Sequence, residues 1–388
     1  MGSLVSKTAI QDATDRKSGS VDAEVSSSPT PVAPDDEEVK VKVFHAWEEP
    51  IDNYLAPVPL SGAEVEGWEH VDAGNSPEED IDNSAHMSSM SVTVATFARV
   101  GASEILKCHY DGFEGEFKRR WMSQFGTTPT VCLMLWIKID PHTTFVDEEG
   151  TNNGKDARPR HLLWALMWLK VYCTLEQMRT SLGNPPPVEK TINKWVRIFV
   201  RAISFLESSV ILWNARYLSD IGNEALVTID GTDMNCEIRF DKRFYSHKFK
   251  SGGLRYEVGV CIRTGRIVWI HGPFRCGKTD ITISRNAVLY ALRDGERVEA
   301  DLGYRGEDLK INTPNEFGSR EMEKMKQYAR SRHETANQRM KIFGVLSQRY
   351  RHDIQYHSRC FRAVAVIVEL NIETFAPLHD VVYVDTQA

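Results

Sequence analysis

The chain has 388 residues, of which 41% are hydrophobic and 10% aromatic, and this is more than one average domain requires. A net charge of −7 argues at first against a nucleic-acid partner. The charge is unevenly distributed, however: residues 1–90 hold 5 Lys and Arg against 19 Asp and Glu, and the remaining residues hold 42 Lys and Arg against 35 Asp and Glu. An acidic segment therefore precedes a basic body, and charge does not exclude nucleic acid as a ligand of that body.

Seven cysteines are spread along the chain without a C-x-x-C pair. This spacing is typical neither of a disulfide framework nor of a zinc site, and it favours a reducing compartment, the cytosol or the nucleus. No apolar run approaches the roughly 20 residues that a membrane-spanning helix needs, and no signal peptide is recognisable. We therefore expect no membrane partner.

Residues 1–88 are rich in Ser, Pro, Asp and Glu and poor in aromatics, which predicts a disordered acidic tail. A helical region is predicted over residues 89–220. It begins with aromatic residues that recur at helical spacing: Phe113, Phe117, Trp121 and Phe125.

Three further segments of this region have clear signals. An apolar segment follows the aromatic residues over positions 129–139. Residues 150–158 are polar and rich in Gly and Asn, which predicts a loop. A strongly helical stretch then runs from residue 160 to about residue 172.

Residues 174–201 predict a helix-turn-helix. Thr174 and Gln177 have the form of a capping box that opens a short helix, which ends at Gly183 before the prolines at 185–187. The second helix presents a basic face of candidate DNA-binding residues: Lys190, Lys194 and Arg197. A basic second helix is typical of DNA-binding helix-turn-helix units, although an ordinary helical hairpin with an exposed basic face gives the same pattern.

Residues 221–388 predict an α/β domain, because runs rich in Val, Ile and aromatics alternate with helical patterns. The predicted strands cover residues 225–230, 254–263, 266–271 and 297–301. The predicted helices run from Asp280, as a capping residue, to about residue 293, from 318 to 350, with or without an interruption, and from 361 to 370.

Three carboxylates of this domain are candidates for catalysis. Asp230 and Asp301 each end a predicted strand, and Glu334 lies within the long helix. Hard oxygen ligands of this kind suit Mg²⁺ or Mn²⁺, and two such ions activate the attacking oxygen and stabilise the leaving oxygen of a phosphoryl transfer. Any one of them alone is more often a helix cap or a surface carboxylate, but their order and spacing favour a common site.

The segments around these residues resemble the DDE transposases of the PIF/Harbinger type. The resemblance is carried by VTIDGTD at residues 227–233, EADLGYRG at 299–306 and RHETANQRMKIFGVL at 332–346. It extends over about residues 113–385 and is greatest with the divergent copies found in diatoms and related algae.

The resemblance implies an RNase H-like catalytic core in which Asp230, Asp301 and Glu334 are the catalytic triad and the ligands of two Mg²⁺ or Mn²⁺ ions. The implied reaction is cleavage of DNA at the terminal inverted repeats of a transposon, followed by strand transfer into target DNA. A homo-oligomer on DNA, a separate Myb-like DNA-binding protein and a nuclear location are implied as well. Two positions depart from the pattern of relatives: Gln327 replaces a tyrosine, and Leu302 replaces a second aspartate.

Further basic residues are candidates for contact with the DNA backbone. Lys248 and Lys250 lie in a basic stretch interleaved with aromatics, and Arg330, Arg332 and Lys341 lie on the predicted helix of Glu334. Lys and Arg beside a phosphodiester site are suited to hold phosphates, in a salt-dependent manner. A solvated helix face is the alternative interpretation.

The sequence is compatible with two alternative functions. A domesticated, catalytically silent DNA-binding protein would keep the same fold and the same sequence segments. Residues 272–279 also fit the G-x4-G-K-T pattern of a nucleotide-binding loop, with Lys278 as its lysine. Pro273, however, lacks one of the backbone N–H groups that such a loop needs.

Overall fold

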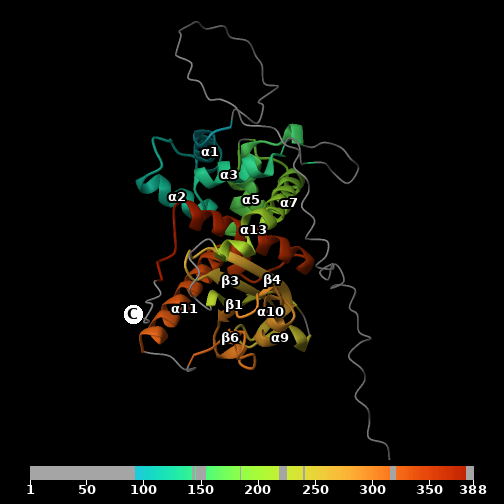
Figure 1. The fold of residues 1–388 in the computed structure, drawn as a ribbon. Coiled ribbons are helices and arrows are strands. Elements are labelled where there is room, and N and C mark those ends of the chain that lie inside the picture. The colour runs from blue at the N-terminus through green and yellow to red at the C-terminus, as the bar shows by residue number, and fades with distance from the viewer. Residues whose placement is uncertain are drawn as a thin grey trace, which may run out of the picture. The chain divides into compact units, whose positions relative to one another are not determined.

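The structure of the chain is a computed structural model that describes residues 92–141, 145, 154–183, 185–217, 225–238, 241–314 and 320–381. The acidic tail predicted over residues 1–88 lies outside the described residues, as does part of the loop predicted over residues 150–158. The predicted α/β class is confirmed, because a mixed sheet is flanked by helices (Figure 1).

The first described part is helical and is built on buried aromatic rings. Trp121 of α2 (Gly115–Phe125) is fully buried between Phe117 and Phe125, and its indole donates to the carbonyl of Thr127 at 2.7 Å. The predicted helix is therefore confirmed for Phe117, Trp121 and Phe125, whereas Phe113 lies before its first residue. The other elements of this part are α1 (Val94–Val100), the π-helix η3 (Gly101–Leu106), α3 (Pro129–Ile139), η4 (Gly154–Asp156) and α5 (Pro159–Val171).

The two helices of the predicted helix-turn-helix are present as α6 (Leu175–Ser181) and α7 (Glu189–Phe205). The capping box is confirmed: the Gln177 N–H donates to Thr174 Oγ1 at 3.2 Å, and the Thr174 N–H donates to Gln177 Oε1 at 3.1 Å. α7 buries one apolar face, which includes Trp195 and Phe199. The short elements α8 (Glu207–Val210) and η5 (Trp213–Tyr217) follow.

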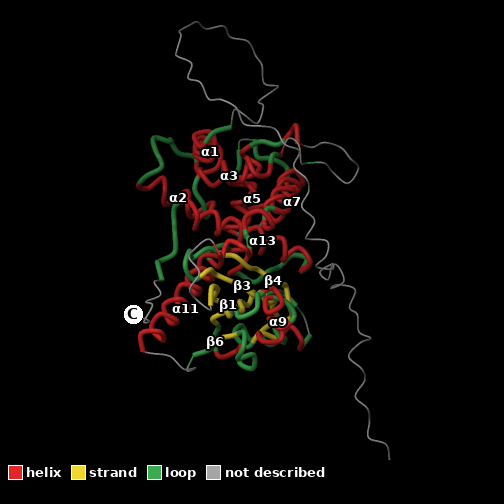
Figure 2. The backbone as a smooth tube through the Cα atoms, in the orientation of Figure 1, coloured by secondary structure: helices red, strands yellow, loops and turns green. Residues whose placement is uncertain are grey.

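The central strand of the sheet is β1 (Ala225–Asn235), which pairs antiparallel with β3 (Ser251–Cys261) and parallel with β5 (Arg297–Glu299). β3 also pairs antiparallel with β4 (Ile267–Arg275) and with β2 (Tyr245–Ser246), and β5 pairs parallel with β6 (Ile311–Asn312). An antiparallel half and a parallel half thus meet at β1. Figure 2 shows the strands in one group below α13.

The four predicted strands are present, with different ends. The strand predicted over 225–230 runs on to Asn235, because β3 stays paired with it as far as that residue. The strand predicted over 297–301 ends at Glu299, beyond which Asp301 starts the short helix η7 (Leu302–Tyr304) as its N-cap.

Two predicted helices are interrupted. The helix predicted from Asp280 to about residue 293 consists of α9 (Asp280–Arg285) and α10 (Val288–Ala291), because Ala287 between them has φ −142° and ψ −90°. Its N-cap is Thr279, so the capping role predicted for Asp280 is wrong. The helix predicted over 318–350 consists of α11 (Arg320–Lys341) and α12 (Gly344–Ser347).

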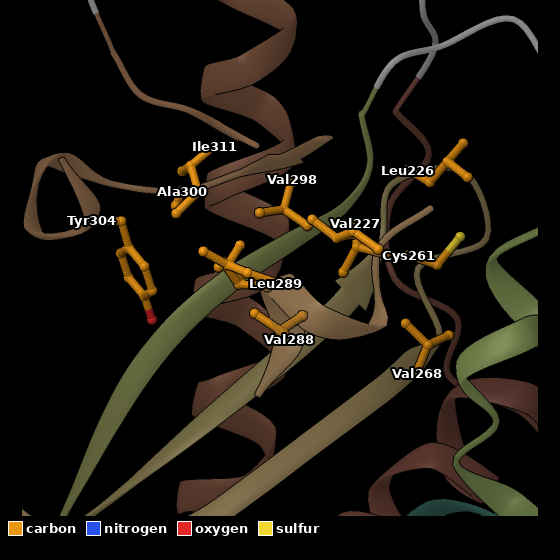
Figure 3. Close-up of a cluster of buried hydrophobic side chains, with 12 residues drawn as sticks. Leu226, Val227, Cys261, Val268, Val288, Leu289, Val298, Ala300, Tyr304 and Ile311 are labelled. Atoms are coloured by element: carbon orange, nitrogen blue, oxygen red, sulfur yellow. The ribbon is translucent and has the colours of Figure 1, made fainter. Parts of the chain in front are cut away.

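The core beneath the parallel half of the sheet is aliphatic. Val227 of β1 and Val298 of β5 belong to one buried cluster with Val288 and Leu289 of α10 and with Tyr304 (Figure 3). Burying each aliphatic side chain of this size contributes about 1.5–3 kcal/mol. This packing fixes β1 and β5 against α10 and thereby fixes the residues that follow each strand.

The closing helix α13 (Ile354–Thr374) contacts both the sheet and the helical part (Figure 1). Phe361 stacks on Tyr256 of β3 with ring centroids 3.7 Å apart, and Glu369 accepts a backbone N–H of β4 at 2.6 Å. At its other side, Asn371 accepts the hydroxyl of Thr127 at 2.5 Å. The segments predicted as residues 89–220 and 221–388 therefore share this helix.

Arg216 of η5 is 1% exposed and joins the helical part to the turn before β5. Its Nε donates to Glu296 Oε1 at 2.6 Å, and its guanidinium lies 3.8 Å from the ring centroid of Trp213. The Glu296 side chain is only 7% exposed, so this ion pair is buried.

We expect Arg216→Ala to lower the free energy of unfolding by about 3–5 kcal/mol, because it leaves the Glu296 carboxylate buried without its cation. Urea denaturation measures this loss. Arg293→Ala is the matched control, because Arg293 also stacks on Tyr217 but is exposed, and it should cost less than about 1 kcal/mol. Equal losses for the two variants would contradict this account of the pair.

Candidate active site

Asp230 lies in the middle of β1, opposite Val258 of β3. Its predicted position at the end of a strand is therefore wrong, since β1 continues for five residues beyond it. The parallel pairing of β1 with β5 ends near Asp230, because its last residue pair is Thr228 and Glu299. From Asp230 onward, β1 is therefore not paired with β5.

The parallel register places Asp301 beside Asp230. Thr228 is opposite Glu299, and the two aspartates follow these partners by two residues each. Residues two apart on extended strands face the same side, so Asp230 and Asp301 are expected as neighbours where the parallel pair opens. Asp301 is exposed, and its Oδ1 accepts the N–H of Gly303 at 2.8 Å.

The electrostatics of Asp230 agree with this proximity. Burial, followed by repulsion from Asp301 and Asp280, raises the pKa of Asp230 to about 7. A hydrogen bond from the Gly231 backbone and attraction to Lys341 act in the opposite direction. Asp230 is therefore a half-buried carboxyl whose ionised form the neighbouring carboxylates disfavour.

Asp280 is a site residue that sequence reasoning assigned only as a helix cap. It begins α9, and a β-carbon at position 231 would meet its Oδ1, so a side chain there would have to displace this carboxylate. Arg255 of β3 donates to Asp280 Oδ1 at 3.1 Å and to Asp233 Oδ1 at 2.7 Å. The pKa of Asp280 is raised, first by burial, with Arg255 opposing the shift.

Asn337 of α11 is a second residue that sequence reasoning missed. Its Nδ2 donates to Asp230 Oδ2 at 2.9 Å. One turn earlier on the helix, His333 Nδ1 and Thr228 Oγ1 form a hydrogen bond of 2.9 Å. α11 therefore packs along β1, and its Asn337 orients the Asp230 side chain. The sequence offered one signal for Asn337: it lies three residues after Glu334, and residues three apart are neighbours on a helix surface.

Glu334 lies inside the long helix, as predicted, and is exposed. Asn337, rather than Glu334, makes the contact between α11 and Asp230. Within the described part of the chain, no three His, Cys, Asp or Glu side chains form a group ready to hold a metal. The structure thus brings Asp230, Asp280 and Asp301 close to one another. Neither these three nor the predicted triad with Glu334 forms a ready-made ligand set among the described residues.

The carboxylates of this site suit a hard divalent cation. Asp230, Asp280 and Asp301 offer oxygen ligands, and their mutual repulsion would be relieved by bound positive charge. These residues could therefore hold the Mg²⁺ or Mn²⁺ that the resemblance implies.

Positive charge borders these carboxylates. Burial, followed by repulsion from Lys248, lowers the pKa of Lys341 to about 8, while Asp230 and Asp233 oppose the shift. Lys248 is exposed, as is Lys250, whose φ is +53°. Lys341 and Lys248 therefore stand where they could meet a phosphate bound at the carboxylates.

Two arginines of α11 have other roles. Arg332 is 1% exposed and donates to the carbonyls of Cys261 and Ile262 at the end of β3, so the DNA contact predicted for it does not fit its position. Arg330 is half-buried and forms an ion pair of 3.0 Å with Glu323.

The basic face predicted on α7 is at the surface. Lys190, Lys194 and Arg197 are all exposed. Arg197 stacks on Tyr356 with its guanidinium 5.2 Å from the ring centroid, and its Nε donates to Asn193 at 3.3 Å. Lys194 likewise lies over an aromatic ring, with its Nζ 5.4 Å from the ring centroid of Trp195.

The segment over residues 272–279 does not form a phosphate-binding loop. Its first four residues belong to β4. The Gly277 N–H donates to the carbonyl of Arg243 at 2.9 Å, and the Lys278 N–H donates to the carbonyl of Arg275 at 3.0 Å. Since these N–H groups are engaged, the segment lacks the converging donors that a nucleotide phosphate needs.

No protein-family model, curated protein or solved structure matches this chain. None of the described helices is both long and apolar enough to cross a bilayer.

The raised pKa of Asp230 has a measurable consequence. A carboxyl whose folded pKa exceeds its unfolded value of 3.8 stabilises the fold at low pH, and this contribution is lost as the pH rises towards 7. Asp230→Asn removes the ionisation. The stability of this variant relative to the parent should therefore rise by at least about 1 kcal/mol between pH 4 and pH 8, since one pKa unit corresponds to about 1.4 kcal/mol.

Urea denaturation in EDTA at pH 4, 6 and 8 measures this difference. Asp308→Asn, at an exposed position, is the control and should show no comparable trend. A stability difference for Asp230→Asn that does not change with pH would contradict the account of Asp230.

Proposed function

We propose that this chain is a metal-dependent DNA endonuclease and transposase of the PIF/Harbinger type. The observation that carries the proposal is the register of β1 and β5, which brings Asp230 beside Asp301, with Lys341 close by. Paired carboxylates next to a cation are the groups that phosphoryl transfer requires, because the reaction depends on positioning and on charge stabilisation.

Within this proposal the side chains have distinct roles. Asp230 and Asp301 hold the divalent ions, and Asn337 keeps Asp230 oriented through its 2.9 Å hydrogen bond. Bound Mg²⁺ or Mn²⁺ would supply Lewis-acid activation of the attacking water and of the leaving oxygen. Lys341 and Lys248 contact the phosphate of the cleaved strand.

An RNase H-like core is part of the proposal. The mixed sheet, with helices packed against it, supports such a core at the level of fold class. The resemblance places the third catalytic carboxylate at Glu334, three residues before Asn337 on α11. DNA binding would bring this exposed side chain towards the ions.

The exposed lysines of α7 support a role for residues 174–201 in holding the terminal inverted repeats. Assembly as a homo-oligomer on DNA, cooperation with a Myb-like protein and a nuclear location belong to the same proposal, on the basis of the resemblance.

A catalytically silent DNA-binding protein is the second candidate. The observation in its favour is that Glu334 is exposed and that no three acidic side chains among the described residues form a ready metal site. This candidate keeps the DNA-binding role of α7 and lacks strand cleavage.

Strand cleavage distinguishes the two candidates. The substrate is duplex DNA taken from the genomic sequence that flanks the reading frame, incubated with Mg²⁺ or Mn²⁺. We expect metal-dependent nicking, reduced roughly 100-fold or more in Asp230→Asn, Asp301→Asn and Glu334→Gln, because each removes charge that stabilises the transition state. Asp308→Asn, exposed on the turn before β6, should cleave like the parent. Cleavage by Asp230→Asn at the parent rate would overturn the proposal.

DNA affinity tests the role of α7. The double variant Lys190→Ala and Lys194→Ala should bind the same duplex more weakly and reduce the slope of log K against log salt concentration by about 1–2, because each phosphate contact contributes roughly 0.9. Lys107→Ala and Lys138→Ala remove exposed lysines outside α7 and serve as the matched control. An unchanged slope would show that α7 does not contact the DNA backbone.

A further inference from the structure

The carboxylate of Asp280 lies against two glycines, one that follows Asp230 in the chain and one that lies close to Asp301. Position 231 is a glycine, and any β-carbon there would collide with the Asp280 carboxylate. Position 303 is also a glycine: a β-carbon there would lie 3.0 Å from Asp301 Oδ1 and 3.3 Å from Asp280 Oδ2. Because both oxygens lie within 3.3 Å of one point, Asp280 and Asp301 face the same small space.

The two oxygens of Asp280 have different surroundings. Oδ1 accepts from Arg255 at 3.1 Å, whereas Oδ2 is the atom directed to Gly303 and the carboxylate of Asp301. The ion pair with Arg255 therefore holds the carboxylate in place and leaves its second oxygen directed towards the other aspartates.

Asn337 supplies a second observation at this place, a buried polar atom without a partner. The residue is 8% exposed, and its Nδ2 donates to Asp230 Oδ2. Its Oδ1 has no hydrogen-bond partner among the described residues. Since the amide is bonded to Asp230, a cation held by that carboxylate could also satisfy the Oδ1.

Tyr304 adds a second such observation. It is 1% exposed, and its hydroxyl has no hydrogen-bond partner in the described part of the chain. After burial, the charges of Glu257, Asp280, Asp230 and Asp301 all raise its pKa, so the phenol lies within electrostatic reach of these carboxylates. A buried donor without a protein partner suits a bound water molecule.

We propose that Asp280 is a further carboxylate ligand of the divalent cation held by Asp230 and Asp301, with the Asn337 Oδ1 as a neutral oxygen ligand. This inference rests on the metal site of the proposed function. It assigns to Asp280 a role in binding the ion, in addition to its ion pair with Arg255.

Binding of Mn²⁺ alone to the full chain, measured by calorimetry without DNA, tests the assignment. Asp280→Asn should weaken Mn²⁺ binding by more than about 100-fold, because groups that only orient a ligand already contribute about 10–100-fold. Asp233→Asn is the matched control, because it also removes a carboxylate bonded to Arg255, and its loss of affinity should not exceed that range of about 10–100-fold. Asn337→Ala should weaken binding as well.

Asp280→Glu keeps the negative charge beside Arg255 but displaces the carboxylate oxygens. If Asp280→Asn does not fold, Asp280→Glu tests the assignment in its place. It should also weaken Mn²⁺ binding. Parent-like affinity in a folded Asp280 variant, or an equal loss in Asp233→Asn, would overturn the assignment while leaving the proposed function in place. Absence of Mn²⁺ binding by the parent would overturn both. Mn²⁺ binding that depends on Asp280, without DNA cleavage, would support the assignment and contradict only the proposed reaction.

Discussion

Strands β1 and β5 pair in parallel with Thr228 opposite Glu299, and the candidate site depends on this register. It places Asp230 and Asp301 at equivalent positions where the pairing of the two strands ends. The aliphatic cluster of Val227, Val298 and α10 holds the register, because a shift by one residue would turn these side chains out of the core. Packing beneath the sheet thus fixes the positions of Asp230 and Asp301 where this parallel pairing ends.

Helix α11 depends on the same strand. A hydrogen bond between Thr228 and His333 and one from Asn337 to Asp230 fix the helix along β1. Arg332 ties the same helix to the carbonyls at the end of β3. The site therefore combines a rigid sheet with a helix that carries Asn337, Lys341 and Glu334. Charges of both signs meet there, which is the arrangement expected where a metal ion and a phosphate bind side by side.

The sequence was sufficient to predict most elements and the class of the fold. Runs of β-branched residues marked the strands, and the capping box at Thr174 marked a helix start, because both are local signals. The proximity of Asp280 to Asp301 could not be predicted, since it arises from the packing of α9 near glycines 231 and 303. The burial of Arg332 was hidden for a similar reason: a basic residue on a charged helix gives no sign of the distant carbonyls that accept from it.

The central claim is that Asp230 and Asp301 bind one divalent cation. Anomalous diffraction from crystals soaked in Mn²⁺ tests it most directly. The account predicts a peak at about 2.1 Å from carboxylate oxygens of both aspartates, the distance typical of small octahedral cations. A peak that contacts neither aspartate, or no peak at millimolar Mn²⁺, would contradict it.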